Sequence, residues 1–251
     1  MPMKRILVIN PNSSEKMTRD IRETLSKGNL PAQIEVICMK KAPPVLESFT
    51  DYTLAGAEII EYFTEQDMTR YDGILLACFG DPCLYSLKEI SPVPVLGIAE
   101  AAFSRALLLG YKFSVLAASS KALPMMESMI DTYGLQARNA GSMTLNTPIE
   151  EFLSDAEQLE GKLLKVIQGA KEKQAEVVIY GCAGMTMISK KKIMELTQVS
   201  VIDPVITGVS TLLSLLSDGD SVSGAGLYAK HQPKRTECEA INIKPHKEEK
   251  R

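Results

Sequence analysis

The feature of this chain that most constrains its fold is a pattern of landmarks that occurs twice. Three landmarks in the first half recur in the second half in the same order, at offsets of 107, 104 and 106 positions. Three matches at a nearly constant offset indicate an internal duplication. Pair by pair, the landmarks are the strand starts Ile6 and Phe113, the cysteines Cys78 and Cys182, and the valines Val95 and Val201.

Between these landmarks, apolar runs rich in β-branched residues alternate with longer amphipathic stretches, which is typical of βαβ units around a parallel sheet. With the duplication, this predicts an α/β fold of two similar lobes with parallel Rossmann-like or flavodoxin-like sheets. The active site is then expected in the cleft between the lobes. We predict strands at Ile6–Ile9, Gln33–Cys38, Gly73–Cys78, Val93–Ile98, Phe113–Ala117, Glu176–Tyr180 and Val199–Ile202. We predict helices at Ser14–Lys27, Leu54–Thr69, Pro82–Ile90, Ala99–Gly110, Lys121–Tyr133, Glu150–Lys173, Thr186–Leu196 and Val205–Leu216.

The repeat also predicts where the lobes divide. Residues 1–97 together with 205–230 are expected to form the first α/β lobe, because the helix after the last repeated strand would return to it. Residues 98–204 are expected to form the second α/β lobe. The segment 231–251 is rich in Lys, Glu and Pro with little periodicity, which predicts an extended or disordered tail.

Composition narrows the classes of partner. A net charge of -3 over 251 residues offers no basic field for phosphate backbones, so no nucleic-acid partner is expected. No run approaches the roughly 18 apolar residues of a membrane span, and the N-terminal run is too short for a signal peptide. We therefore expect a cytoplasmic protein with no membrane partner. The 5 cysteines are an odd number at irregular spacing, and the 2 histidines lie near the C-terminus, so we expect reduced thiols and no metal site.

Two cysteines stand where a predicted strand gives way to a loop. Cys78-Phe79-Gly80 and Cys182-Ala183-Gly184 each place a glycine two residues after the thiol. Inverting a carbon centre requires one group to remove a proton from one face and another group to return a proton to the other. A thiol suits both roles, because N–H groups at a helix start can lower its pKa from about 8.5 toward neutrality. The pair indicates a two-base site that handles a carbon-bound proton.

Structural explanations compete with these functional ones. A strand-end cysteine taken alone is more often a small core residue, and only the equivalent placement of Cys78 and Cys182 favours catalysis. Asn10 and Asn12 could serve a turn and a helix cap as readily as a ligand. Asp81 is expected to be a helix-start residue that favours the positive end of the helix dipole.

These motifs resemble the aspartate/glutamate/hydantoin racemase superfamily, most closely its hydantoin racemase branch, which includes allantoin racemases. The resemblance spans about Ile6 to Tyr228. It implies cofactor-independent racemisation of 5-monosubstituted hydantoins, allantoin being one candidate, with Cys78 and Cys182 as the two acid/base residues. It also implies a small-molecule substrate and a homo-oligomer. The matching segments are Ile9–Ser14, Cys78–Pro82, Gly97–Ala101 and Gly181–Met185.

Carried over by position, the resemblance also implies substrate-binding residues. Two amides at the mouth of the first strand would bind ring amides and carbonyls, with a serine pair as their counterpart in the second lobe. Four residues after the cysteines would offer backbone N–H groups to the carbonyl that becomes enolate-like. The residues are Asn10, Asn12, Ser119, Ser120, Phe79, Gly80, Ala183 and Gly184.

Two matters stay open at the level of sequence. Cys83 stands where the family usually has glycine, and in the first turn of a helix it could narrow the pocket or alter substrate choice. The same scaffold would also serve an aspartate/glutamate-type amino-acid racemase or a related isomerase or decarboxylase. A non-catalytic protein that binds a small metabolite is the alternative from another class.

Overall fold

The computed structural model describes residues 3–146, 156–187 and 190–229. It contains two four-stranded parallel sheets, with strand orders β2-β1-β3-β4 and β6-β5-β7-β8. The second order repeats the first, strand for strand, so the duplicated α/β fold of two lobes is confirmed. The strands are β1 Lys4–Asn10, β2 Ala32–Cys38, β3 Gly73–Leu76, β4 Val95–Gly97, β5 Phe113–Ala117, β6 Met143–Thr144, β7 Val177–Tyr180 and β8 Ser200–Ile202.

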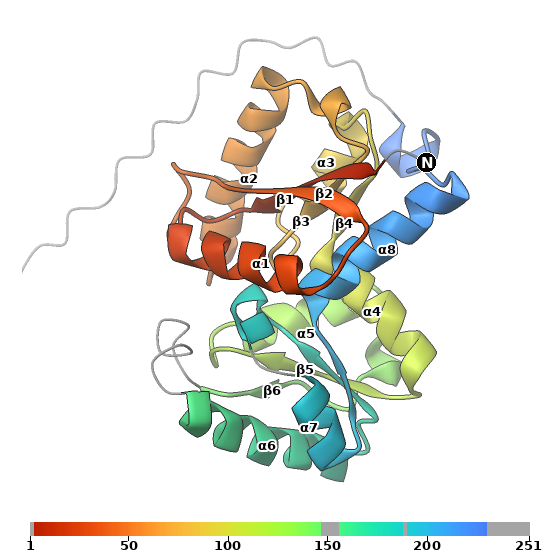
Figure 1. The fold of residues 1–251 in the computed structure, drawn as a ribbon. Helices are drawn as coiled ribbons and strands as arrows, with labels where there is room; N and C mark the ends of the chain where they lie inside the picture. Colours follow the sequence, from red (N-terminus) through yellow and green to blue (C-terminus); the bar gives the residue numbers. More distant parts are fainter. Residues whose placement is uncertain (1–2, 147–155, 188–189, 230–251) are drawn as a thin grey trace, which may run out of the picture.

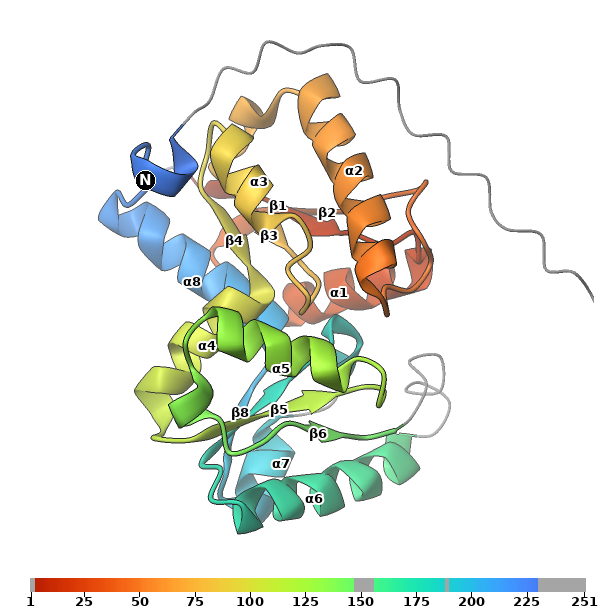
Figure 2. The same ribbon diagram turned by 180° about the vertical axis from the view of Figure 1, so that it is seen from behind.

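Helices cover both faces of each sheet (Figure 1). Helices α2 and α3 lie on the outer face of the first sheet, and α1 and α8 lie on its inner face. The second sheet has α4 and α5 on its inner face, as the reverse view in Figure 2 shows, and α6 and α7 outside. The helices are α1 Glu15–Lys27, α2 Phe49–Glu65, α3 Leu84–Ile90, α4 Ile98–Leu109, α5 Leu123–Thr132, α6 Ala156–Glu172, α7 Lys190–Thr197 and α8 Pro204–Asp218.

Burial on both faces explains why the strands are nearly continuous apolar runs. Ile6 and Val8 of β1 face the inner layer, whereas Leu7 and Ile9 face α2 and α3, and all four are fully buried. The inner layer is one hydrophobic cluster that contains residues of both sheets. The two lobes therefore share a core.

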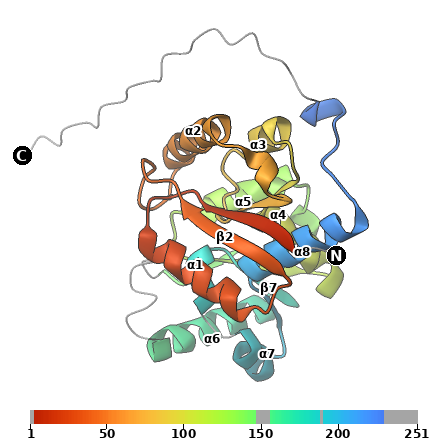
Figure 3. The ribbon, with the colours of Figure 1, turned by 45° about the horizontal axis from the view of Figure 1, so that its top comes forward.

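Helix α8 returns to the first sheet after the last strand of the second. A Cβ on Gly208 of α8 would lie 2.7 Å from the side chain of Leu75, so this glycine permits close packing on β3. Figure 3 shows α1 and α8 on one side of the edge strand β2, with α2 and α3 on the other. Helix α8 thus packs on the first sheet, and the division of the chain into 1–97 with 205–230 and 98–204 stays a prediction.

Some element boundaries differ from the predictions. Helix α2 begins at Phe49, five residues before the predicted start at Leu54, and β6 is a two-residue strand that the sequence pattern does not show. Helix α5 begins at Leu123 rather than at the predicted Lys121, with Ala122 as its N-cap, and Ser119 Oγ accepts the Ala122 N–H at 3.3 Å. Parts of the helices predicted from Glu150 and from Thr186, and the predicted tail, lie outside the described residues.

Candidate active site

The two cysteine loops leave their sheets in the same way. The Ala77 N–H donates to Ile9 O at 2.8 Å, and the Gly181 N–H donates to Leu116 O at 2.9 Å. Each hydrogen bond joins the residue before the cysteine to the neighbouring central strand. In both sheets this is the point where strand order reverses, which is the usual ligand position in open α/β sheets. The repeated hydrogen bond places Cys78 and Cys182 at equivalent positions.

One cavity of about 60 Å³ contains both cysteines. At roughly 15 Å³ per water molecule, this volume corresponds to about four water molecules, so the cavity is small. Most of its lining is apolar, and none of its described lining residues is Lys, Arg or His. The lining residues are Asn12, Met17, Val45, Leu46, Glu47, Tyr52, Ala77, Cys78, Phe79, Gly80, Ala118, Ser119, Ala122, Met126, Gly181, Cys182 and Ala183.

Burial dominates the ionisation of both thiols. It raises the pKa of Cys78 to about 12, against one opposing hydrogen bond from the Gly80 N–H. It raises the pKa of Cys182 to about 11, against opposing hydrogen bonds from the Gly184 and Met185 N–H groups. The expectation that N–H groups bring these thiols toward neutrality is therefore wrong for the unliganded cavity, because desolvation outweighs them.

Asn12 lines the cavity, whereas Asn10 does not. Asn10 is fully buried and donates to Asn12 Oδ1 at 2.8 Å and to Thr18 Oγ1 at 3.0 Å, so its amide orients Asn12 and the start of α1. The Asn12 Nδ2 donates to Met17 Sδ at 3.2 Å. Because a thioether is a weak acceptor, a ligand oxygen could take over this N–H.

The serine pair divides in a similar way. Ser119 lines the cavity at the end of β5, and its hydroxyl oxygen accepts the Ala122 N–H, which leaves its own hydroxyl hydrogen for another acceptor. Ser120 is exposed, does not line the cavity, and donates to Asn146 Oδ1 at 3.0 Å.

The residues after the cysteines serve different purposes. Phe79, Gly80 and Ala183 line the cavity, and the buried Phe79 ring packs edge-on against Phe103 with ring centres 5.6 Å apart. Gly184 is not a lining residue; its N–H donates to Cys182 Sγ at 3.4 Å. The N–H groups of Gly80 and Gly184 therefore point at sulfur in the unliganded cavity.

Among the lining residues that the sequence analysis did not single out, Glu47 and Tyr52 carry polar side chains, and both lie around the start of α2. The Tyr52 ring lies over Gly80, where an added Cβ would be 2.1 Å from the Tyr52 hydroxyl oxygen. The Glu47 carboxylate faces the cavity closely enough to raise the pKa of Cys182. Among the described residues, no hydrogen bond or ion pair engages that carboxylate. The Ser48-x-x-Asp51 capping signal could have revealed this helix start.

Cys83 lies outside the cavity of the two cysteines. It is the N-cap of α3, with a left-handed φ of 56°, and it lines the neighbouring cavities on the far side of Tyr52 and Gly80. Cys83 is therefore not part of the wall of the cavity that contains Cys78 and Cys182, and its effect on substrate choice stays a prediction. Within residues 3–146, 156–187 and 190–229, no group of three or more His, Cys, Asp or Glu side chains is arranged to hold a metal ion.

Two thiols presented to one cavity by duplicated sheets form the arrangement that the sequence analysis expects of a two-base site. The chain belongs to the Asp/Glu/hydantoin racemase family, whose model matches residues 6–212, and this confirms the resemblance seen in the motifs. The hydantoin and allantoin racemases to which this chain is similar are isomerases.

Particular relatives narrow the comparison. A hydantoin racemase from Pseudomonas sp. (strain NS671) is 32% identical over 231 residues, covering 89% of this chain and 90% of that protein. A hydantoin racemase from Paenarthrobacter aurescens is 31% identical, covering 92% and 99%. The crystal structure of allantoin racemase from Pseudomonas fluorescens superposes with a TM-score of 0.85 at 27% identity, covering 92% of this chain and 98% of that one.

Proposed function

We propose that this protein racemises 5-monosubstituted hydantoins by proton transfer at C5 of the ring, with Cys78 and Cys182 as the two acid/base groups. The observation that carries the proposal is that both thiols line one small cavity from equivalent positions of the two lobes. One thiolate removes the C5 proton, the ring carbonyl next to C5 takes the negative charge as an enolate, and the opposite thiol donates its proton to the other face of C5. The first cysteine ends as a thiol and the second as a thiolate, so the proton count balances.

The carbonyl beside C5 makes its proton acidic enough for this route, so we expect the reaction to need no cofactor. Asn12 Nδ2 and the Ser119 hydroxyl stand at the carboxyl ends of β1 and β5 and are suited to the ring oxygens. We assign no direct substrate contact to Asn10, Ser120 or Gly184, because the first orients Asn12, the second lies outside the cavity and the third donates to Cys182.

The charges of the cavity favour a neutral ring over an acidic amino acid. Its described lining offers no Lys, Arg or His to pair with a substrate carboxylate. It contains the Glu47 carboxylate, which would repel one. The same carboxylate can accept N–H groups, which the hydantoin ring and the ureido group of allantoin both carry. An aspartate/glutamate-type racemase and a decarboxylase of acidic substrates are therefore the weaker candidates.

The decisive experiment follows both optical activity and deuterium at C5. Each enantiomer of 5-benzylhydantoin and of allantoin is incubated with the protein in D₂O, with aspartate and glutamate as comparison substrates and a protein-free blank. We expect loss of optical activity with deuterium incorporation for a hydantoin, and none for the amino acids. Cys78→Ser and Cys182→Ser should each lower racemisation by about 10²-fold or more, since each removes one acid/base group.

Cys83→Ser provides the matched control, because this thiol is nearby but lines other cavities. It should keep the native rate. Near-native racemisation by either Cys78→Ser or Cys182→Ser would refute the two-thiol assignment. If the native protein exchanged no hydantoin C5 proton and both thiols titrated with ordinary pKa values, a metabolite-binding protein would be the better account.

Two further expectations, on cellular location and on oligomeric state, accompany this function. We propose a cytoplasmic location, supported by the free state of all four cysteines in the described part of the chain. We also propose a homo-oligomer, which sedimentation would test directly. No described helix combines the length and the apolarity required to cross a bilayer.

A further inference from the structure

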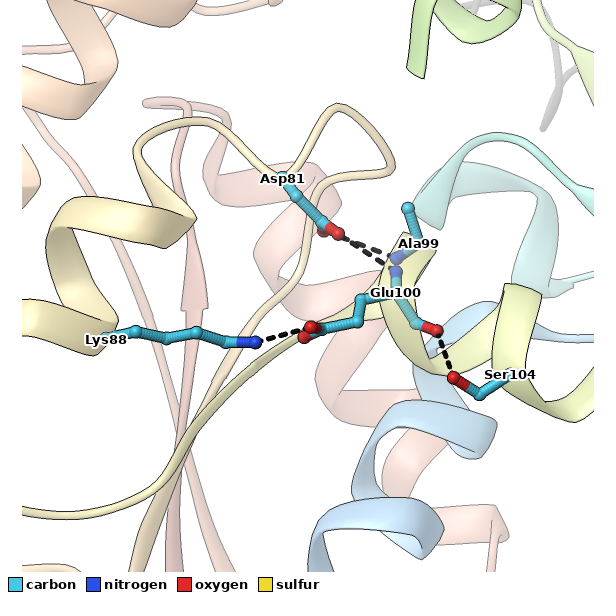
Figure 4. Close-up of polar contacts among 5 residues, drawn as sticks. All are labelled: Asp81, Lys88, Ala99, Glu100 and Ser104. Carbon is cyan, nitrogen blue, oxygen red and sulfur yellow. Dashed lines mark hydrogen bonds and ion pairs between the residues drawn. The ribbon is translucent and has the colours of Figure 1, made fainter. Parts of the chain in front are cut away.

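The loop that carries Cys78 also supplies a cap to a distant helix. The Asp81 carboxylate accepts the N–H of Ala99 at 3.2 Å and the N–H of Glu100 at 3.0 Å (Figure 4). Both donors belong to the first turn of α4, whose N–H groups have no partner within the helix. The N-cap of α4 is Gly97, which has no side chain to accept them.

The local backbone is shaped to let this contact form. A Cβ on Gly97 would lie 2.3 Å from the Asp81 carboxyl carbon, so any side chain at position 97 would displace the carboxylate. Asp81 itself has a φ of 40°, in the left-handed region that aspartate and asparagine adopt more readily than most residues. The Asp81 N–H donates to Cys78 O at 2.9 Å, which closes the loop directly behind the thiol.

In the second repeat, the corresponding helix is capped by the residue that precedes it. Position 203 corresponds to position 97 at the offset of 106, and there the chain has Asp203. This aspartate caps its own helix, α8, by accepting the Val205 N–H at 2.9 Å and the Ile206 N–H at 3.1 Å. The cap of α8 is thus made within the helix, whereas the cap of α4 comes from the loop of a catalytic cysteine.

Helix α4 connects the two lobes. It follows β4 of the first sheet, and it packs against β7 and β8 of the second sheet. A second link lies beside the first, because Lys88 of α3 forms a largely buried ion pair with Glu100 of α4 (Figure 4). The Cys78 loop is therefore held against an element that packs on the sheet from which the Cys182 loop emerges.

We propose that Asp81 is a positioning residue that fixes the Cys78 thiol relative to the Cys182 thiol by tying the Cys78 loop to α4. The inference rests on the proposed racemisation for its kinetic consequence. The position of the thiol itself is independent of any substrate. In an active site, a displacement of about 1 Å can lower the rate by about 10²-fold.

The experiment compares Asp81→Asn with Asp203→Asn. Asparagine tolerates the left-handed backbone at position 81 but offers one acceptor where the carboxylate offers two. Asp81 accepts its two N–H groups through different carboxylate oxygens, so Asp81→Asn loses one of these bonds, whereas Asp203 accepts both through Oδ1, which asparagine retains. Asp203→Asn therefore controls for the loss of a carboxylate at a helix start. We expect Asp81→Asn to lower kcat for 5-benzylhydantoin by roughly 10-fold to 100-fold with little change in KM, and Asp203→Asn to keep kcat within about twofold.

A second readout needs no substrate. In a Cys182→Ser background, alkylation of Cys78 by iodoacetamide is followed by mass spectrometry. Asp81→Asn should speed this alkylation several-fold, because it frees the loop that carries the thiol, whereas Asp203→Asn should not. If Asp81→Asn does not fold, Gly97→Ala displaces the same carboxylate while retaining it, and the same changes are expected.

Native alkylation and native kcat in both Asp81→Asn and Gly97→Ala would overturn the inference, as would equal effects of Asp81→Asn and Asp203→Asn. Failure of the proposed function is distinguishable from this result. In that case the native protein would racemise no hydantoin, while the alkylation comparison would still decide whether Asp81 positions Cys78.

Discussion

At the scale of single residues, the two thiols are equivalent in position but unequal in environment. Cys182 accepts two backbone N–H groups and Cys78 accepts one, in keeping with the lower pKa of Cys182. Cys182 is therefore expected to ionise first. Both pKa values lie above the usual range, so we expect both sulfurs to be protonated at neutral pH.

This predicts how the racemisation rate depends on pH. A raised pKa means that the sulfur keeps its proton to higher pH, so the thiolate fraction grows about tenfold per pH unit well below that pKa. We expect log(kcat/KM) for racemisation to rise with a slope of about +1 between pH 6 and pH 8. Circular dichroism of a hydantoin enantiomer measures it. A flat profile over this range would show that one thiol is already ionised at neutral pH.

The sequence predicted that Cys78 and Cys182 occupy equivalent positions, because each follows an apolar strand, each precedes a glycine by two residues, and their offset matches that of the other landmarks. It did not distinguish Asn12 from Asn10, since which of two neighbouring amides faces the cavity depends on packing against Thr18 and Met17. Glu47 was missed for a related reason. Its role depends on a long-range approach to the opposite lobe, which no local pattern records.

At the scale of elements, the start of α2 is the segment that completes the cavity. Ser48 Oγ accepts the Asp51 N–H at 3.1 Å, and Asp51 Oδ2 accepts the Glu47 N–H at 3.0 Å. This reciprocal cap fixes the turn that presents Glu47 and Tyr52. The apolar pattern predicted a start at Leu54 because Phe49 is exposed and breaks the periodicity.

Removal of this cap should affect both stability and substrate binding. We expect Ser48→Ala to lower the free energy of unfolding by about 0.5–2 kcal/mol, as for other N-caps. It should also raise KM for the hydantoin, because Glu47 and Tyr52 lose their fixed turn. Urea unfolding and steady-state kinetics measure the two effects. Asp67→Ala, which removes the cap of a short helix at Met68–Arg70, is the control and should leave KM unchanged.

At the scale of the whole molecule, the two sheets enclose one apolar layer. The ring of Phe103 on α4 packs against Phe79, next to Cys78, and against Phe113 and Tyr133 of the second half. The repeat offsets predicted two sheets of like topology, because duplicated strand patterns fold alike. They could not predict the shared layer, which depends on how the inward-facing helices meet.

The buried aspartates at the starts of α4 and α8 predict a decline in stability with pH. Burial raises the pKa of Asp81 to about 8 and that of Asp203 to about 6, from 3.8 in the unfolded chain. Below the unfolded value both states are protonated; above it the unfolded state loses its proton first, so folding is disfavoured until the folded pKa is reached. The stability contributed by Asp81 should be lost between about pH 4 and 8, and that of Asp203 between about pH 4 and 6.

Urea unfolding of the native protein, Asp81→Asn and Asp203→Asn across this range measures the effect. The free energy of unfolding of native protein relative to Asp81→Asn should fall steadily up to about pH 8, and relative to Asp203→Asn only up to about pH 6. Parallel curves for all three proteins would contradict the raised pKa values.

The unequal surroundings of the two cysteines have a consequence in thermodynamics. A racemase acts on mirror images of equal energy, so its equilibrium constant is unity and kcat/KM must be the same in both directions. One more N–H on Cys182, or a tether on the Cys78 loop alone, cannot make the enzyme favour one enantiomer at equilibrium. They can make kcat differ between the two enantiomers only if KM differs by the same factor. The two halves of the duplicated fold can therefore differ in structure, as they do at Asp81 and Asp203, while the equilibrium constant between the two enantiomers stays at unity.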